Sequence, residues 1–167
     1  ACGMIRKKLC LLGTSAVGKT SLARRFVRGI FSDEYLTTLG VKIDKKAVLL
    51  GEVRVELLVW DLNGEDSFQK LQMSYLRGSA GYLLVADGTR PTTLDYALDL
   101  HERAQRVTGA VPYLMLLNKA DLVTEWSLDD ARMASLEAAG HEVRRTSAKS
   151  AEGVEAAFHD LAARMLG

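Results

Sequence analysis

Proline, cysteine and unbalanced charge are all scarce in this chain of 167 residues. It has two prolines and two cysteines, and its 22 lysines and arginines nearly match its 21 aspartates and glutamates, for a formal net charge of +1. With 48% hydrophobic and 26% charged residues, disorder and a multi-domain chain are disfavoured, and one compact domain is expected over residues 4–167. The balanced charge supplies no broad basic surface, so we expect no nucleic-acid partner.

Long hydrophobic runs are also missing. No stretch approaches 18 uninterrupted apolar residues, and the N-terminus has no signal-peptide core. Cys10 lies in an apolar run, where it is interpreted as a small buried side chain and not as half of a disulfide. We therefore expect a cytoplasmic protein with no membrane span. Residues 1–3 precede Met4 and are interpreted as an expression scar.

Apolar segments typical of buried strands alternate with segments of helical periodicity. Strands are predicted at 5–12, 42–50, 52–61, 81–86, 111–117 and 142–146, and helices at 19–28, 92–108, 128–139 and 153–166. The second and third strands are joined by a short turn at Gly51, which predicts a hairpin and hence one antiparallel edge strand. The expected fold is therefore α/β, with a six-stranded mixed sheet flanked by helices.

Glycine and serine mark the ends of the predicted helices. Gly29, Gly109 and Gly140 each follow a helical segment, as is typical of helix C-termini. Ser127 is predicted to cap the N-terminus of the helix at 128–139, with Asp130 completing a capping box.

Residues 13–20 read GTSAVGKT and follow the first predicted strand directly. This complete G-x-x-x-x-G-K-T pattern leads into a predicted helix, which is the context of a phosphate-binding P-loop in a three-layer NTPase fold. Lys19 can reach the terminal phosphates of a nucleotide, and the Thr20 hydroxyl can ligate Mg²⁺. A glycine-rich turn without a ligand is the alternative, which the strand–loop–helix context disfavours.

Phosphate binding is assigned to consecutive residues whose backbone and side chains lie at the positive end of a helix. These residues are Ser15, Ala16, Val17, Gly18, Lys19, Thr20 and Ser21.

Two polar segments later in the chain each follow a predicted strand. Residues 118–121 read NKAD, and residues 147–149 read SAK, so both lie at the strand ends where open α/β sheets bind ligands. The Asp121 carboxylate can accept two hydrogen bonds from the N1–H and 2-amino groups that guanine has and adenine lacks. The sequence therefore predicts GTP or GDP as the nucleotide.

These motifs, together with Thr38 and the segment 61–64 (DLNG), resemble in their order and spacing the Ras superfamily of small GTPases. The resemblance covers essentially the whole chain. Residues 35–41, the pair Trp60-Asp61 and residues 74–78 resemble the Rab branch in particular.

The resemblance implies roles around the triphosphate. Thr38 would ligate Mg²⁺ and sense the γ-phosphate, and Asp61 would reach Mg²⁺ through water, alongside Thr20. The Gly64 amide would contact the γ-phosphate. Thr37 stands beside Thr38 and leaves the register open by one residue, although the following Gly-Val favours Thr38. Asp61 as a strand-end cap is a further alternative.

The resemblance also implies roles around the base. Phe31 would stack against guanine, with a core position as its alternative. Asn118 and Lys119 would brace the base pocket, and Ala148 would offer its backbone amide to the guanine oxygen. These residues complete the base site with Asp121 and the neighbouring Ser147 and Lys149.

Glu65 departs from the family pattern, which usually has a water-orienting glutamine at this position. A carboxylate cannot donate a hydrogen bond to the γ-phosphate, and its charge opposes the phosphate oxygens. Slow hydrolysis is therefore expected, promoted mainly by Lys19, Mg²⁺ and backbone donors. A raised pKa that lets Glu65 act as a base is the opposing interpretation.

Ile43 replaces the phenylalanine of the aromatic triad that Rab proteins use at effector surfaces, whereas Trp60 and Tyr75 fit it. No cysteine follows Cys10, so the sequence contains no prenylation signal. A divergent member is implied. The three histidines share no metal-ligand spacing and are assigned to the surface or core.

The function expected is a monomeric switch that binds GTP or GDP with Mg²⁺. Regulatory and effector proteins would bind at switch I (35–41) and switch II (61–77), which γ-phosphate contacts order and hydrolysis releases. Two other functions remain open. One is a scaffold that holds GTP without hydrolysing it, and the other is a P-loop kinase or ATPase, against which the NKAD segment argues.

Overall fold

The computed structural model describes residues 4–14, 16–28, 42–62 and 74–167. In chain order, the elements are β1 (Ile5–Leu12), α1 (Lys19–Arg28), β2 (Lys42–Leu50), β3 (Val53–Asp61), β4 (Gly81–Asp87), α3 (Pro91–Thr108), β5 (Tyr113–Asn118), the 3-10 helix η2 (Val123–Glu125), α4 (Asp130–Ala138), β6 (Val143–Arg145) and α5 (Val154–Leu166).

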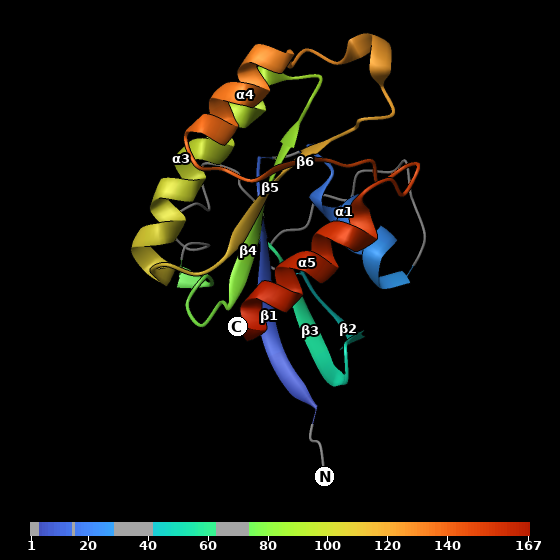
Figure 1. Ribbon diagram of the computed structural model, residues 1–167, viewed down its shortest axis with the longest axis vertical. Coiled ribbons are helices and arrows are strands. Elements are labelled where there is room, and N and C mark those ends of the chain that lie inside the picture. Colours follow the sequence, from blue (N-terminus) through green and yellow to red (C-terminus); the bar gives the residue numbers. More distant parts are fainter. Residues whose placement is uncertain (1–3, 15, 29–41, 63–73) are drawn as a thin grey trace.

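The six strands form one mixed sheet in the order β2-β3-β1-β4-β5-β6 (Figure 1). The β2–β3 pair is antiparallel and joined by a turn at Gly51-Glu52, while the other four pairs are parallel. This confirms the predicted α/β fold, the hairpin and the antiparallel edge strand. The parallel strands direct their carboxyl ends to one edge of the sheet, where ligand sites of such folds lie.

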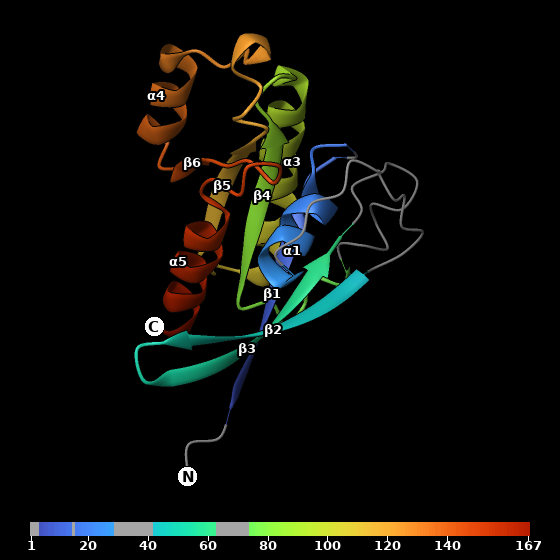
Figure 2. The same ribbon diagram turned by 90° about the vertical axis from the view of Figure 1, so that its right-hand side faces the viewer.

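Helices cover both faces of the sheet (Figure 2). Alternate residues of β1 enter the two opposite cores. Leu9 and Leu11 pack with α1 and α5 on one face, where the rings of Phe26 and Phe158 stack with centroids 4.1 Å apart. Cys10 enters the other core, with α3 and α4. Its thiol is buried beside Ser79, and burial raises its pKa to about 11, which confirms the structural role expected for this cysteine.

The N-terminus of α4 differs from the prediction. The helix begins at Asp130, and its N-cap is Asp129, whose carboxylate accepts a hydrogen bond from the Arg132 amide at 2.8 Å. The hydroxyl of Ser127 instead donates to the carbonyl oxygens of Thr89 and Glu125. A carboxylate one residue before the helix thus takes the capping position, and Ser127 joins a neighbouring loop.

β1, α1 and β2 have the predicted bounds, and the bounds of the remaining elements differ by one or two residues. β5 begins after Pro112, which has no N–H for a strand ladder, and α5 begins at Val154 with Gly153 as its N-cap. Gly109 and Gly140 end α3 and α4 with positive φ, as predicted, whereas Gly29 lies outside the described residues.

In the described part of the chain, no helix has both the length and the hydropathy required to cross a bilayer.

Candidate functional site

The P-loop connects the carboxyl end of β1 to the start of α1, as its sequence predicts. Ala16 and Gly18 both have positive φ, 63° and 99°, which turns the backbone sharply before the helix. Lys19 is 6% exposed, and its ammonium donates to the Thr14 carbonyl oxygen at 3.4 Å. The loop is therefore folded around the stem of the lysine that is expected to reach phosphates.

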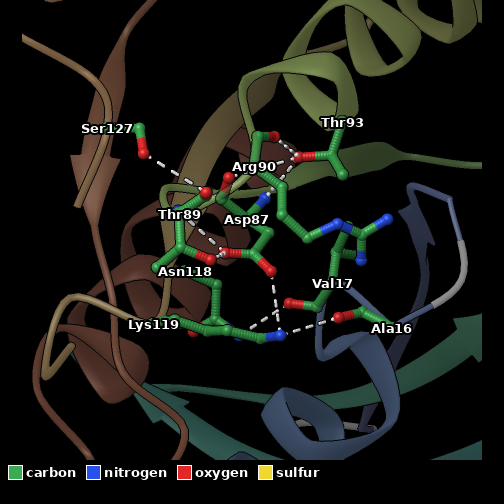
Figure 3. A network of polar contacts seen from close by, with 9 residues as sticks. All are labelled: Ala16, Val17, Asp87, Thr89, Arg90, Thr93, Asn118, Lys119 and Ser127. Carbon is green, nitrogen blue, oxygen red and sulfur yellow. Dashed lines mark hydrogen bonds and ion pairs between the residues drawn. The ribbon is translucent and has the colours of Figure 1, made fainter. Parts of the chain in front are cut away.

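Two side chains at the end of β5 bind the backbone of this loop (Figure 3). The Asn118 amide donates to the Val17 carbonyl oxygen, and the Lys119 ammonium donates to that of Ala16, both at 2.9 Å. A Cβ on Gly18 would collide with the Asn118 amide nitrogen. The close approach of these segments therefore requires glycine at position 18.

The two polar segments assigned to base recognition also contact one another. Ser147 is fully buried, and its hydroxyl donates to Asp121 Oδ1 at 2.7 Å. Thr146 donates through its hydroxyl to Asn118 Oδ1 at 3.2 Å. Since a carboxylate offers about four acceptor positions, Asp121 can accept from Ser147 and still face a ligand. The structure thus brings Asp121, Ser147 and Asn118 together.

Arg25 on α1 supports the same region and was not singled out by sequence. Its guanidinium donates to the carbonyl oxygens of Ala148 and Lys149, each at 2.8 Å. These bonds fix the backbone of the loop after β6 against α1. The sequence did not indicate this contact, because Arg25 lies far in sequence from residues 148 and 149.

Two oxygen donors meet beside the P-loop. The Thr20 hydroxyl, at the start of α1, donates to Asp61 Oδ2 at 2.5 Å, and Asp61 is only 3% exposed at the end of β3. Hydroxyl and carboxylate oxygens are the hard ligands that Mg²⁺ prefers. The residues present therefore fit a magnesium site.

Asp87 is a further buried carboxylate at this edge of the sheet. It ends β4, is fully buried, and lies 2.9 Å from the Lys119 ammonium. Thr89 also donates to Asp87 Oδ1, through its backbone N–H at 2.9 Å and its hydroxyl at 2.6 Å. Burial tends to raise the pKa of Asp87, but the bonds from Lys119 and Thr89 outweigh it and hold that pKa below its usual value.

Sequence reasoning missed Asp87, although a signal was present. It is an aspartate at the carboxyl end of a buried strand, the same position that identified Asn118 and Asp121. Without a motif around it, nothing in the sequence linked it to Lys119.

Five predicted site residues lie outside the described part of the chain: Ser15, Phe31, Thr38, Gly64 and Glu65. The same is true of switch I and of most of switch II. The contacts above therefore concern the P-loop, the guanine-reading segments and the Thr20–Asp61 pair.

Ile43, Trp60 and Tyr75 lie together on the sheet face that carries Lys8. Ile43 is paired with Trp60 in the β2–β3 register, and the rings of Trp60 and Tyr75 are 6.1 Å apart. Ile43 is 46% and Tyr75 38% exposed. The three side chains thus form a partly exposed apolar surface beside the end of β3.

The histidines lie away from these contacts. His101 is buried against Tyr82, whose hydroxyl is 2.8 Å from His101 Nδ1, and His141 makes the same contact with Tyr113. His159 faces Glu155 on α5. Within the described ranges, no three His, Cys, Asp or Glu side chains are grouped to hold a metal ion.

Comparison with known proteins identifies relatives over nearly all of the chain. The sequence model of the Ras family matches residues 8–167. The chain is 32% identical over 157 residues to Ras-related protein Rab-8B of Dictyostelium discoideum, covering 93% of this chain and 77% of that protein. It is 36% identical over 159 residues to Rab-25 of Oryctolagus cuniculus, with 92% and 73% covered. It is 33% identical over 162 residues to Rab-13 of Rattus norvegicus, with 95% and 79% covered.

Proposed function

Because this chain belongs to the Ras family of small GTPases, we propose that it is a guanine-nucleotide switch that binds GTP or GDP with Mg²⁺ and hydrolyses GTP slowly. The observation that carries the proposal is the joining of the P-loop to the guanine-reading segments. Asn118 and Lys119 each bind a P-loop carbonyl, and Ser147 holds Asp121 at the same edge of the sheet. One ligand that has both phosphates and guanine would contact all of these groups.

Each part of the nucleotide has residues proposed to bind it. The phosphates are bound by residues 15–21, the base by Asp121 and the amide of Ala148 with Phe31 stacked on it, and Asn118, Lys119, Ser147 and Lys149 shape the base site. Mg²⁺ would be held by Thr20, Thr38 and Asp61, and when bound it neutralises charge on the β- and γ-phosphate oxygens. This division follows the polarity of the groups, since backbone N–H donors suit phosphates and a carboxylate suits guanine.

Hydrolysis consists of attack by water on the γ-phosphorus and cleavage of its bond to the β–γ bridging oxygen. Lys19 stabilises the negative charge that spreads over the phosphate oxygens, and the Gly64 amide is proposed to donate to the same oxygens. Glu65 cannot replace the hydrogen-bond donor of a glutamine, so the attacking water is poorly oriented. A low intrinsic rate follows, and a partner protein that supplies an arginine or glutamine would raise it.

The proposal includes binding of regulatory and effector proteins to the two switch segments. Ile43, Trp60 and Tyr75 lie within or next to these segments in the sequence, and their partly exposed surface offers apolar contact area. A cytoplasmic monomer is proposed, and the low cysteine content is in keeping with the reducing compartment. The domain proposed to carry all of this spans residues 4–167.

A scaffold that holds GTP without hydrolysing it is the second candidate function. The observation that favours it is the carboxylate of Glu65 at the position where the family usually orients water. A protein of this kind would bind its partners constitutively, because no hydrolysis would release the switch segments.

One experiment separates the two functions. Nucleotide is extracted from freshly purified protein and identified, and GTP hydrolysis is then followed under single-turnover conditions with Mg²⁺. Recovery of GDP with measurable phosphate release supports the switch, whereas retained GTP without release over hours supports the scaffold.

Lys19→Met keeps the buried stem but lacks the charge, and should bind GTP much more weakly.

Competition between ATP and GTP tests the base assignment in the same assay. Asp121 is expected to favour guanine strongly, because adenine lacks both donors that a carboxylate would accept. Equal affinity for the two nucleotides would contradict the guanine site and favour a kinase or ATPase.

A further inference from the structure

We propose that Asp87 is a positioning residue of the nucleotide site, which holds Lys119 against the P-loop and thereby slows nucleotide release. The inference rests on the proposed function, since it assigns a role to a residue behind the same site. Asp87 itself lies on β4 and is not among the residues proposed to touch nucleotide. It would act only through the lysine that it holds.

The Asp87 carboxylate and the Lys119 ammonium form an ion pair that is costly to separate. Asp87 is fully buried, whereas the Lys119 side chain is 32% exposed, with its ammonium between the carboxylate and the Ala16 carbonyl oxygen (Figure 3). A buried carboxylate is costly unless a counter-charge and donors accompany it. Lys119 and Thr89 supply them. Moving Lys119 away would leave the carboxylate of Asp87 buried without its counter-charge, so the lysine is strongly held.

The residues at the two ends of the Lys119–Ala16 hydrogen bond both have an unusual backbone conformation. Ala16 has φ of 63° and Lys119 has φ of 69°, a left-handed conformation that residues with a Cβ adopt only when their surroundings enforce it. The bond from Lys119 to the Ala16 carbonyl joins these two positions directly. The Asp87–Lys119 pair therefore helps to keep the P-loop in its turned shape.

Thr89 adds a second connection from Asp87 to the surrounding loops. Its hydroxyl and N–H orient the carboxylate, while its carbonyl oxygen and that of Gly88 accept hydrogen bonds from Ser127. The Gly88 amide in turn donates to the Asn118 carbonyl oxygen at 3.0 Å. The carboxylate thus has a fixed direction, which is what positioning a lysine requires.

The test is the rate at which fluorescent mant-GDP and mant-GTP leave the protein when excess unlabelled nucleotide is added. Asp87→Asn keeps the size of the side chain but removes its charge, and turns a donor toward Lys119. We expect release to become about tenfold faster, and by a similar factor for both nucleotides, because Lys119 is proposed to shape the base site, which GDP and GTP share.

A double-mutant cycle distinguishes positioning from a general effect on stability. In a Lys119→Met background the lysine is absent, so adding Asp87→Asn should change release by less than about twofold. Asp95→Asn is the matched control, because it neutralises an exposed carboxylate that pairs with Arg132 on the surface, and it should release nucleotide at the wild-type rate. Asp87→Ala replaces Asp87→Asn if thermal unfolding shows that the latter is not folded.

The outcomes separate the two proposals. Equal acceleration by Asp87→Asn in both backgrounds would overturn the positioning role, as would a wild-type release rate in folded Asp87→Asn protein. If wild-type protein captured no mant-GDP, the proposed function would fail and the role of Asp87 would fail with it. Accelerated release in the single variant alone, with little change in the double variant, is the supporting result.

Discussion

Glu65 differs from glutamine in one group of atoms, an amide nitrogen replaced by a charged oxygen. The amide of a glutamine can accept a hydrogen bond from water and donate one to a phosphate oxygen, whereas an ionised carboxylate can only accept. In the proposed complex, its charge also repels the negative γ-phosphate and raises the energy of the transition state for hydrolysis. In the proposed function, the chemistry of this single position therefore distinguishes a slow switch from a scaffold.

Glu65→Gln should accelerate single-turnover GTP hydrolysis by about tenfold or more, because it restores the donor and removes the repulsion. Phosphate release at saturating GTP and Mg²⁺ measures this directly. Glu137→Gln is the control, since it removes an exposed carboxylate on α4 and should leave the rate unchanged. No gain in Glu65→Gln would contradict the repulsion argument and favour Glu65 as a base.

At the scale of elements, the proposed nucleotide site includes residues of α1 and of the loop after β6, and Arg25 joins the two. Arg25 supplies two bonds to the carbonyl oxygens of residues 148 and 149. These carbonyls belong to the loop whose Ala148 amide is proposed to face guanine. The helix that carries residues of the proposed phosphate site thus also contacts the loop of the proposed base site.

Arg25→Met should speed the release of guanine nucleotides by about threefold to tenfold, because it keeps the apolar stem but removes two charge-assisted hydrogen bonds. Release of mant-GDP measures the effect. Arg103→Met is suited as a control, since Arg103 pairs with Asp99 along the exposed side of α3. An unchanged release rate in Arg25→Met would mean that the loop keeps its shape without α1.

Gly88 lies where the loop after β4 packs against the segment before α4. A Cβ at this position would lie only 2.0 Å from the nearest ring carbon of Trp126, and Arg145 lies over the same ring with its guanidinium carbon 5.2 Å from the centroid. The indole is thus packed between two elements, and its ring has little room to move.

Gly88→Ala should lower the free energy of unfolding by about 2 kcal/mol, because overpacking forces the indole or the loop to shift. Urea unfolding measures the loss. Trp126→Leu creates space, so the cost of Gly88→Ala should be smaller in that background. An equal cost in both backgrounds would place the strain in the backbone and not in the contact with Trp126.

At the scale of the whole molecule, most of the fold could be predicted from sequence because local signals agree with it. β1 and α1 have the predicted bounds, since an apolar run, a glycine-rich loop and a helical pattern follow one another without overlap. The P-loop and the segments assigned to guanine recognition each follow a strand, as predicted, although β6 is only partly buried.

The features that could not be predicted depend on contacts between distant segments. Asp87 pairs with Lys119, which follows the neighbouring strand β5 and is distant in sequence. Ser127 does not cap α4, because its hydroxyl bonds to the carbonyl oxygen of Thr89. Two side chains before α4, Ser127 and Asp129, were both suitable caps by type. Only the three-dimensional packing decides between them, and a single sequence does not contain that information in local form.

The acid stability of the molecule should depend on the aromatic cluster between α3 and the sheet. His101 is 7% exposed, its ring lies 4.2 Å from that of Tyr113 and 5.3 Å from that of His141. Burial lowers the pKa of His101 below its ordinary value of 6.5, nearby His141 lowers it further, and Glu102 opposes the shift. Burial also raises the pKa of Tyr82, so its phenol keeps its proton and forms a hydrogen bond with Nδ1 of neutral His101.

Because the folded protein holds His101 neutral at a pH where the unfolded chain protonates it, the unfolded state binds more protons. The free energy of unfolding should therefore fall as the pH drops below about 7 toward 5, by at most about 1.4 kcal/mol per pH unit for one proton. Urea unfolding at several pH values gives this slope. His101→Phe retains a ring against Tyr113 and should flatten the slope, even though the loss of the Tyr82 bond lowers stability at pH 7. His159→Gln, which changes a half-buried histidine paired with Glu155 outside this cluster, should keep the wild-type slope, and an equal flattening in both variants would contradict the assignment to the buried cluster.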